Sequence, residues 1–241
     1  MLVIDIGNSR IKAAQWQHDA WQNYVAQLYQ ASDIPKQLDK LFMNSPVQPV
    51  AISCVVDALK APINEWFVSR WAVTPVFLSS VSHQAGVSNG YAIPESLGVD
   101  RWLAMLAAYH KFKSAVCVID CGTAVTLDVV DSEGQHQGGL IMPGLQLMRA
   151  SLIMNASDIA DLSGEVQELA NNTGDAVKSG CLRLLASGLD RLVQEQQHKF
   201  KNIKLVMTGG DSELVMRNMQ SASVYEETLV LDGVRISVMG S

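Results

Sequence analysis

The stretch Val3-Ile4-Asp5-Ile6-Gly7-Asn8-Ser9 decides the fold, because its pattern returns about half a chain later as Val118-Ile119-Asp120-Cys121-Gly122-Thr123-Ala124. Each copy is an apolar strand that ends in Asp-x-Gly, followed by a small polar residue and a β-branched return strand. A repeat of this kind is most simply explained by two related halves that face each other across a cleft. The sequence therefore predicts an α/β protein whose halves divide near Lys111–Ser114.

The composition indicates a globular protein with no membrane partner. The chain has 241 residues, of which 48% are apolar and 17% charged, which suits one large or two small domains. No apolar run approaches the roughly 18 residues of a spanning helix. Asp5 interrupts the apolar start, and Arg10 and Lys12 follow, so no secretory signal is recognised. We expect a soluble cytoplasmic protein.

Charge and cysteine content exclude two further classes. The net charge is −6, whereas a protein with a broad nucleic-acid footprint is more often basic, so we expect no nucleic-acid partner. The four cysteines form no CxxC pair and have no histidine cluster beside them. We therefore expect buried, reduced thiols rather than a zinc site. They are Cys54, Cys117, Cys121 and Cys181.

The first acidic turn has the chemistry of a phosphate site. Gly7 permits close backbone approach, Asn8 and Ser9 offer donors, and Lys12 supplies a cation. A carboxylate cannot hold a phosphate by itself, so Asp5 implies a bridging Mg²⁺. An ordinary hairpin turn uses the same residue types and is the alternative.

The second acidic turn repeats this arrangement with hydroxyl groups. Thr123 and Thr126 follow Asp120 and can donate to phosphate oxygens. A plain turn is again the alternative, but two such turns at matching positions are harder to dismiss together. The GxxxxGK[ST] loop of Walker-type nucleotide sites does not occur in this sequence.

A third motif, Gly98-Val99-Asp100-Arg101, begins a predicted helix at Val99–Phe112. Asp100 would lie in the first turn, where the helix dipole favours negative charge, and can accept the proton of an attacking hydroxyl. Arg101 can bind an anionic substrate group. Helix-start electrostatics, with Arg101 as a surface partner, is the alternative.

Three weaker signals remain. Thr208-Gly209-Gly210-Asp211 follows a predicted strand and suits either a tight turn or the approach of a flat base. Asn172 or Thr173 can cap a long helix that follows. Tyr91 is by itself most simply a loop aromatic.

In this order and spacing, the motifs resemble the type III pantothenate kinases, which belong to the acetate and sugar kinase, heat-shock chaperone and actin superfamily. The likeness runs from Leu2 to about Gly233. It implies two duplicated actin-like (ribonuclease H-like) domains, 1–112 and 113–241, each a mixed five-stranded sheet flanked by helices, with a cleft between. It also implies ATP-dependent phosphorylation of pantothenate to 4′-phosphopantothenate, the first step of coenzyme A biosynthesis.

The resemblance also implies individual roles. Asp100 would accept the proton of the pantothenate hydroxyl, Asp120 would hold a monovalent cation, K⁺ or NH₄⁺, and Asp5 would hold Mg²⁺ through ATP. The ATP-binding residues would be Asp5, Ile6, Gly7, Asn8, Ser9, Arg10, Ile11, Lys12 and Thr123. The pantothenate-binding residues would be Tyr91, Gly98, Val99, Asp100, Arg101 and Thr173. Thr173 would complete the site across a homodimer interface, which replaces the helix-cap interpretation of this residue.

Two other functions remain as alternatives. One is a different kinase or phosphohydrolase of the same superfamily, against which the motif at 98–101 discriminates. The other is an accessory factor for transcription. The low basic content argues against direct contact with DNA, and Asp5, Asp100 and Asp120 argue for catalysis.

Overall fold

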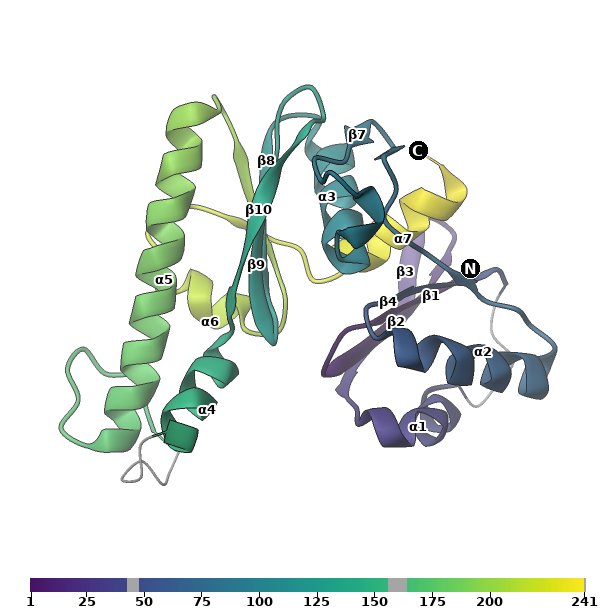
Figure 1. Ribbon diagram of the computed structural model, residues 1–241, viewed down its shortest axis with the longest axis horizontal. Coiled ribbons are helices and arrows are strands. Elements are labelled where there is room, and N and C mark those ends of the chain that lie inside the picture. The colour runs from purple at the N-terminus through teal and green to yellow at the C-terminus, as the bar shows by residue number, and fades with distance from the viewer. Residues whose placement is uncertain (43–47, 156–163, 241) are drawn as a thin grey trace. The chain divides into compact units, whose positions relative to one another are not determined.

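The computed structural model describes residues 1–42, 48–155 and 164–240. These residues form two compact units, which are shown in Figure 1. The first unit comprises Met1–Lys111 and Thr228–Ser241, and the second comprises Phe112–Glu227.

The first unit is built on a mixed five-stranded sheet in the order β3-β2-β1-β4-β5. Strand β1 pairs antiparallel with β2 and parallel with β4. The strands are β1 (Leu2–Ile6), β2 (Arg10–Gln17), β3 (Ala20–Leu28), β4 (Val50–Cys54) and β5 (Val76–Phe77). A small hairpin consists of β6 (His83–Gln84) and β7 (Val87–Ser88). The helices are α1 (Ile34–Leu41), α2 (Asp57–Trp71), α3 (Val99–Phe112) and α7 (Leu229–Met239), with 3₁₀ turns at Ala31–Asp33 and Pro94–Ser96.

The core of this unit lies between the sheet and helices α1 and α2. Every residue of β1 is buried, as in a central strand covered on both faces. Leu2, Ile4 and Ile6 point into the core, so alternation along the strand directs Asp5 to the opposite face. Helix α7 contacts β1 and β4, and Figure 1 shows α7 and the pair α1 and α2 on opposite sides of this sheet.

The second unit repeats the same sheet in the order β10-β9-β8-β11-β12. Its central strand β8 pairs antiparallel with β9 and parallel with β11, as β1 does with β2 and β4. The strands are β8 (Val116–Cys121), β9 (Ala124–Val130), β10 (His136–Pro143), β11 (Lys204–Thr208) and β12 (Val224–Tyr225). The helices are α4 (Leu145–Asn155), α5 (Thr173–Lys199) and α6 (Ser212–Met216).

The core of the second unit lies between its sheet and the long helix α5. Cys117, Ile119 and Cys121 of β8 face Leu185 and Leu189 of α5 in one apolar cluster. Alternation therefore directs Asp120 to the opposite face, as it does Asp5 in the first unit. The identical strand order confirms the predicted α/β fold of two duplicated five-stranded units.

The C-terminal helix is where the observed units differ from the expected division at 112/113. That division gave every residue from 113 onward to the second half, whereas α7 belongs to the first unit. The physical reason is close packing, because Leu231 and Val234 are fully buried and Gly233 lies directly on the backbone of Leu103 in α3. A side chain at position 233 would collide with that backbone.

None of the helices in the described parts of the chain combines the length and the apolar character that crossing a bilayer requires.

Candidate active site

The first acidic turn joins β1 to β2 and is tightly closed. The amide of Gly7 donates to the carbonyl of Arg10 over 3.0 Å. Asp5 is buried, at 6% exposure, and is paired in register with Lys12 on β2. Residues paired directly across strands share a face of the sheet. The fold thus places Asp5 beside Lys12, the cation that the sequence analysis expects to bind phosphate.

Tyr29 anchors this turn from the end of β3, and sequence reasoning did not identify it. Its hydroxyl donates to the carbonyl of Gly7 over 2.6 Å, and its amide donates to the carbonyl of Ser9 over 3.2 Å. Burial raises the pKa of Tyr29, and the charges of Cys54 and Asp5 raise it further. The phenol therefore remains a donor across the neutral range and holds the turn in shape.

The other predicted ATP-binding residues separate into two groups. Asn8 and Arg10 are exposed, and Gly7 and Ser9 are half-buried, so these four are accessible at the turn. Ile6 and Ile11 have fully buried side chains in the apolar core. Their side chains therefore fix the turn to the core, and any contact with a nucleotide would be made by their backbone.

The second acidic turn joins β8 to β9 and is also tightly closed. The amide of Gly122 donates to the carbonyl of Ala124 over 3.1 Å, and that of Gly144 donates to the carbonyl of Thr123 over 3.1 Å. A side chain at position 144 would collide with the carbonyls of Gly122 and Thr123. Gly144 is thus a second anchor that the motif analysis missed, and it leaves the Thr123 side chain exposed.

Gly209 packs against the carboxylate of Asp120. Its φ is +100°, and an added side chain would collide with Asp120 Oδ1 and with the backbone of Cys121. The amide of Asp211 donates to the carbonyl of Cys121 over 3.0 Å. Gly209 therefore has an internal function, because it lets β11 approach the acidic turn.

The thiols beside this turn stay protonated and are therefore poor nucleophiles. Burial raises the pKa of Cys117 to about 12, and the charge of Asp128 adds to this effect. Burial also raises the pKa of Cys121 to about 12, partly offset by a hydrogen bond with Ser212. All four cysteines are free and buried, as the sequence predicted.

The donors at the two acidic turns suit a cation held together with a nucleotide. Carboxylate and hydroxyl oxygens are the ligands that Mg²⁺ and K⁺ prefer. Among the described residues, no group of three or more His, Cys, Asp or Glu gathers as in a resident metal cage. The carboxylate and hydroxyl oxygens at the two turns are nevertheless ligands of the type that Mg²⁺ and K⁺ take.

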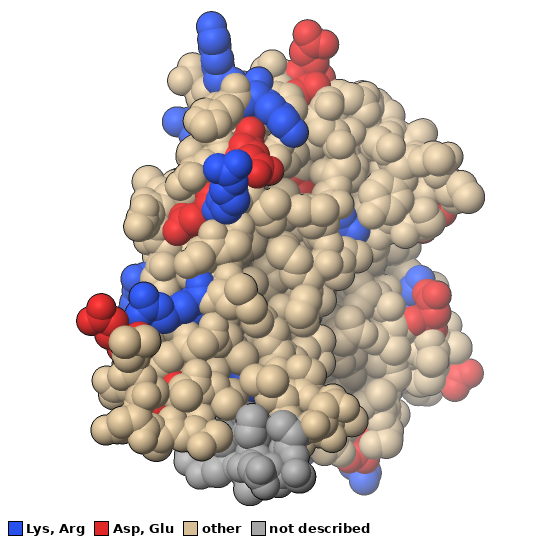
Figure 2. Space-filling model, turned by 60° about the vertical axis from the view of Figure 1, so that its left-hand side comes forward, with Lys and Arg blue, Asp and Glu red and all other residues tan. Residues whose placement is uncertain are grey.

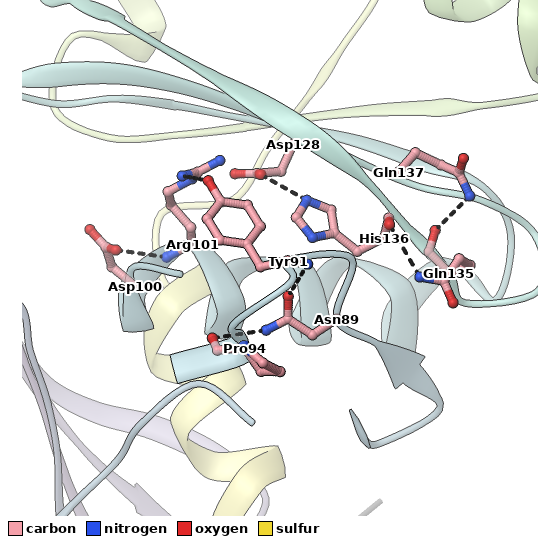
Figure 3. A network of polar contacts seen from close by, with 9 residues as sticks. All are labelled: Asn89, Tyr91, Pro94, Asp100, Arg101, Asp128, Gln135, His136 and Gln137. Atoms are coloured by element: carbon pink, nitrogen blue, oxygen red, sulfur yellow. Dashed lines mark hydrogen bonds and ion pairs between the residues drawn. The ribbon is translucent and has the colours of Figure 1, made fainter. Parts of the chain in front are cut away.

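The third motif begins α3, as its sequence predicted. Asp100 Oδ1 accepts a hydrogen bond from the amide of Arg101 over 2.8 Å (Figure 3). The amide of Trp102 donates to the carbonyl of Gly98. A Cβ at position 98 would lie 2.8 Å from Asp100 Oδ1. Gly98 therefore leaves the space that the half-buried carboxylate occupies.

Arg101 is buried rather than a surface partner, with 7% exposure. Its Nη1 donates to the hydroxyl of Tyr91 over 2.9 Å, and Cζ lies 5.7 Å from the centre of the Tyr91 ring. The amide of Tyr91 donates to Asn89 Oδ1, whose side-chain amide donates to the carbonyl of Pro94 (Figure 3). The structure thus brings Tyr91 and Arg101 together, and it identifies Asn89 as the residue that orders their loop.

A buried, hydrogen-bonded histidine–aspartate pair, which the motif analysis did not identify, lies in the second unit. His136 Nε2 and Asp128 Oδ1 are 3.1 Å apart, with side-chain exposures of 0% and 3%. They lie on the neighbouring strands β10 and β9 and are drawn in Figure 3. Their partnership depends on strand pairing and leaves no local sequence motif.

Thr173 is the first residue of α5 but does not cap it. The side chain of Asn172 accepts a hydrogen bond from the amide of Asp175 over 2.9 Å and is therefore the cap. Thr173 is exposed and lies at a broad hollow of about 1230 Å³ between α4 and α5. The cap interpretation thus belongs to Asn172.

Known structures share the fold of this chain. A Baf family protein from Campylobacter jejuni aligns with 99% of this chain and 98% of its own, with a TM-score of 0.63 and 21% identity. A ROK family glucokinase from Streptomyces griseus aligns with 100% of this chain and 99% of its own, with a TM-score of 0.53 and 12% identity. These likenesses establish the fold, which places the chain in a class of two-unit α/β proteins that includes a sugar kinase.

Sequence comparison gives the particular family. The family model for type III pantothenate kinase matches residues 1–195. A type III pantothenate kinase from Nitrosococcus oceani is 33% identical over 97% of this chain and 92% of its own. The chain belongs to the type III pantothenate kinase family, whose members are ATP-dependent kinases.

Proposed function

We propose that this protein transfers the γ-phosphoryl group of ATP to the hydroxyl of pantothenate, giving 4′-phosphopantothenate for coenzyme A biosynthesis. The observation that carries the proposal is the family match, which includes both acidic turns and the Asp100 motif. The identical strand order of the two units, each with an aspartate at the end of its central strand, supports it.

The Asp5 turn is proposed to bind the ATP phosphates. Mg²⁺ would neutralise charge that develops on the phosphoryl oxygens, and Asp5 would hold it through the nucleotide. Lys12 would supply a second positive charge, and Gly7 would allow the phosphates to approach the backbone. Tyr29 would keep this turn closed.

The Asp120 turn is proposed to have a separate role. Asp120 would hold a monovalent cation, K⁺ or NH₄⁺, and the exposed hydroxyl of Thr123 would donate to the nucleotide. The close fit of Gly209 against the carboxylate supports a defined position for Asp120.

Asp100 is proposed as the proton acceptor. As the pantothenate oxygen bonds to the γ-phosphorus, the bond to the ADP oxygen breaks and the hydroxyl proton moves to the Asp100 carboxylate. The amide of Arg101 fixes one carboxylate oxygen, and the helix start stabilises its negative charge. Arg101 and Tyr91 would bind the pantothenate carboxylate, for which a guanidinium has matching geometry.

The test is Asp100→Asn, with Asp57→Asn as a matched control. Both aspartates lie in the first turn of a helix of the first unit. Loss of a positioned base typically lowers kcat by about 10²- to 10⁴-fold, so Asp100→Asn should lose kcat and keep its affinity for ATP. Asp57→Asn should keep both, and near-normal kcat in Asp100→Asn would remove that residue from the base role.

The proposal includes a homodimer that places Thr173 at the substrate site. The hollow beside Thr173 is lined mainly by apolar side chains, and several are unusually exposed, including Met154 at 83% and Leu184 at 67%. Figure 2 shows an expanse of uncharged residues with scattered Lys, Arg, Asp and Glu on one face. Exposed apolar patches of this kind mark interaction sites.

The dimer is tested by Leu184→Glu, with Leu28→Glu as control. Leu28 is 68% exposed, which matches Leu184, but it lies on β3 of the first unit. Light scattering should give twice the 26.2 kDa chain mass for the wild type and Leu28→Glu, and the single-chain mass for Leu184→Glu. A dimeric Leu184→Glu would exclude this surface.

The free thiols suit the expected cytoplasmic location, where cysteines stay reduced.

A further inference from the structure

Two buried hydroxyl groups occupy equivalent places in the two units. In the first unit, strand register aligns Lys12 of β2, Asp5 of β1 and Ser53 of β4. Because residues paired across neighbouring strands share a face, the Ser53 and Asp5 side chains project to the same side. Ser53 thus flanks the carboxylate on the side opposite Lys12.

The second unit repeats this row with different residue types. Strand register aligns Thr126 of β9, Asp120 of β8 and Thr208 of β11. Thr208 and Ser53 therefore hold equivalent positions: each lies on the parallel strand next to the aspartate of its unit, Asp120 and Asp5. Ligands of open α/β sheets bind at the carboxyl ends of such strands, where Thr208 and Ser53 are found.

Burial of these two hydroxyl groups without a hydrogen-bond partner destabilises the folded chain. Ser53 and Thr208 are each 0% exposed, and neither Oγ has a hydrogen-bond partner among the described residues. A buried polar group without a partner forfeits its hydration, so native interiors rarely keep one. A buried hydroxyl without a hydrogen-bond partner occurs at equivalent positions of the two duplicated units. This recurrence indicates that each hydroxyl forms its hydrogen bond when a ligand is bound.

We propose that Ser53 and Thr208 are positioning residues for Asp5 and Asp120. Neighbouring strands lie about 4.8 Å apart, so rotation about the Cα–Cβ bond brings each hydroxyl within reach of the adjacent carboxylate. The hydroxyl donates to one carboxylate oxygen and orients the other toward a cation: the Mg²⁺ of the nucleotide at Asp5 and the monovalent cation at Asp120. The inference rests on the cation roles in the proposed function.

Such supporting donors are worth about 10- to 100-fold in metal affinity or activity. Ser53→Ala removes only the hydroxyl, and Thr208→Val replaces it with a methyl group of similar size. Thr208→Ser keeps the hydroxyl and loses the methyl group. The control is Ser179→Ala, because Ser179 is also buried but its Oγ accepts from the amide of Gln167.

Two binding measurements, independent of turnover, test the proposal. Calorimetry of MgATP binding should give a dissociation constant raised about 10- to 100-fold in Ser53→Ala. Titration of KCl against the melting temperature, with choline chloride at equal ionic strength, should show the K⁺ requirement raised by the same factor in Thr208→Val. Thr208→Ser should behave as the wild type. Melting temperatures without ligand should be equal or higher in Ser53→Ala and lower in Ser179→Ala.

The outcomes separate this inference from the proposed function. Wild-type binding of MgATP by Ser53→Ala and of K⁺ by Thr208→Val would overturn the positioning roles. Asp5→Asn and Asp120→Asn serve as reference variants, because their failure to weaken the same ligands would instead overturn the cation roles themselves. A wild type that shows no response to K⁺ or Mg²⁺ would overturn both.

Discussion

Gly209→Ala should disturb the Asp120 turn more than its small size suggests. Gly209 directly follows β11 with a φ of +100°, and its added methyl group would collide with Asp120 Oδ1 and the Cys121 backbone. Two penalties therefore act together: a backbone conformation that alanine rarely adopts, and overlap with atoms that belong to a central strand.

The expected loss can be worked from these two penalties. A residue held in a sparsely populated backbone region costs about 1–3 kcal/mol, and overpacking a well-packed site costs about 1–3 kcal/mol. Gly209→Ala should therefore lower the free energy of unfolding by about 2–6 kcal/mol. It should also displace the Asp120 carboxylate and weaken stabilisation by K⁺.

Gly138→Ala provides the matched control for urea-induced unfolding. Gly138 lies in the same unit with a φ of +107°, and nothing among the described residues lies within 4 Å of its added Cβ. The free energy of unfolding of Gly138→Ala should fall only by the backbone penalty, about 1–3 kcal/mol. Its stabilisation by K⁺ should be unchanged. Equal losses of stability in the two variants would refute the reasoning about contact with Asp120.

Three further predictions concern the anchors and the cores. Tyr29→Phe should lower the free energy of unfolding by about 0.5–1.5 kcal/mol and raise KM for ATP, because the Gly7 carbonyl loses its donor; an unchanged KM in steady-state assays would contradict the anchoring role. Cys117 keeps its proton up to a pKa of about 12, whereas the unfolded thiol ionises near 9.0, so its contribution is complete below pH 9.0 and declines above it by about 1.4 kcal/mol per pH unit. In urea titrations, Cys117→Val should show a correspondingly shallower alkaline decline, and an unaltered slope would contradict the assignment. Gly188→Ala should raise the free energy of unfolding by about 0.8–1.0 kcal/mol, because Gly188 lies inside α5 with nothing near its added Cβ among the described residues; a lower stability would show that α5 needs glycine there.

The local architecture could be predicted from the sequence because its signals are local. The repeated strand and acidic turn predicted two related halves, and the spacing of apolar residues predicted α3 with its observed bounds, Val99–Phe112. Glycine after an aspartate at a strand end marks a tight turn in both units. These features depend on neighbours within a few residues.

The supporting residues could not be predicted because they depend on pairing between distant segments. Tyr29 reaches Gly7 across the sheet, and Ser53 meets Asp5 only through the register of β4 with β1. The return of α7 to the first unit depends on Gly233 fitting against Leu103. No short motif encodes any of these contacts, so the sequence identified the turns but not what holds them.

The cation roles at the two acidic turns remain predictions that the fold makes specific. Each aspartate is the last residue but one of a central strand and lies on the face opposite the apolar core. Each is flanked by an equivalently placed pair of residues on the neighbouring strands. The distinction between them is chemical: Lys12 accompanies Asp5, whereas Thr126 accompanies Asp120. A positive neighbour suits the phosphate-bearing turn, and neutral hydroxyls suit a site for a monovalent cation.

The most direct test of the central claim is ADP release by the purified protein with MgATP and pantothenate, measured with K⁺, with NH₄⁺ and with neither. We predict that ADP release requires pantothenate, is accompanied by formation of 4′-phosphopantothenate, and is fastest with K⁺ or NH₄⁺. Absence of pantothenate-dependent release under every cation condition would contradict it.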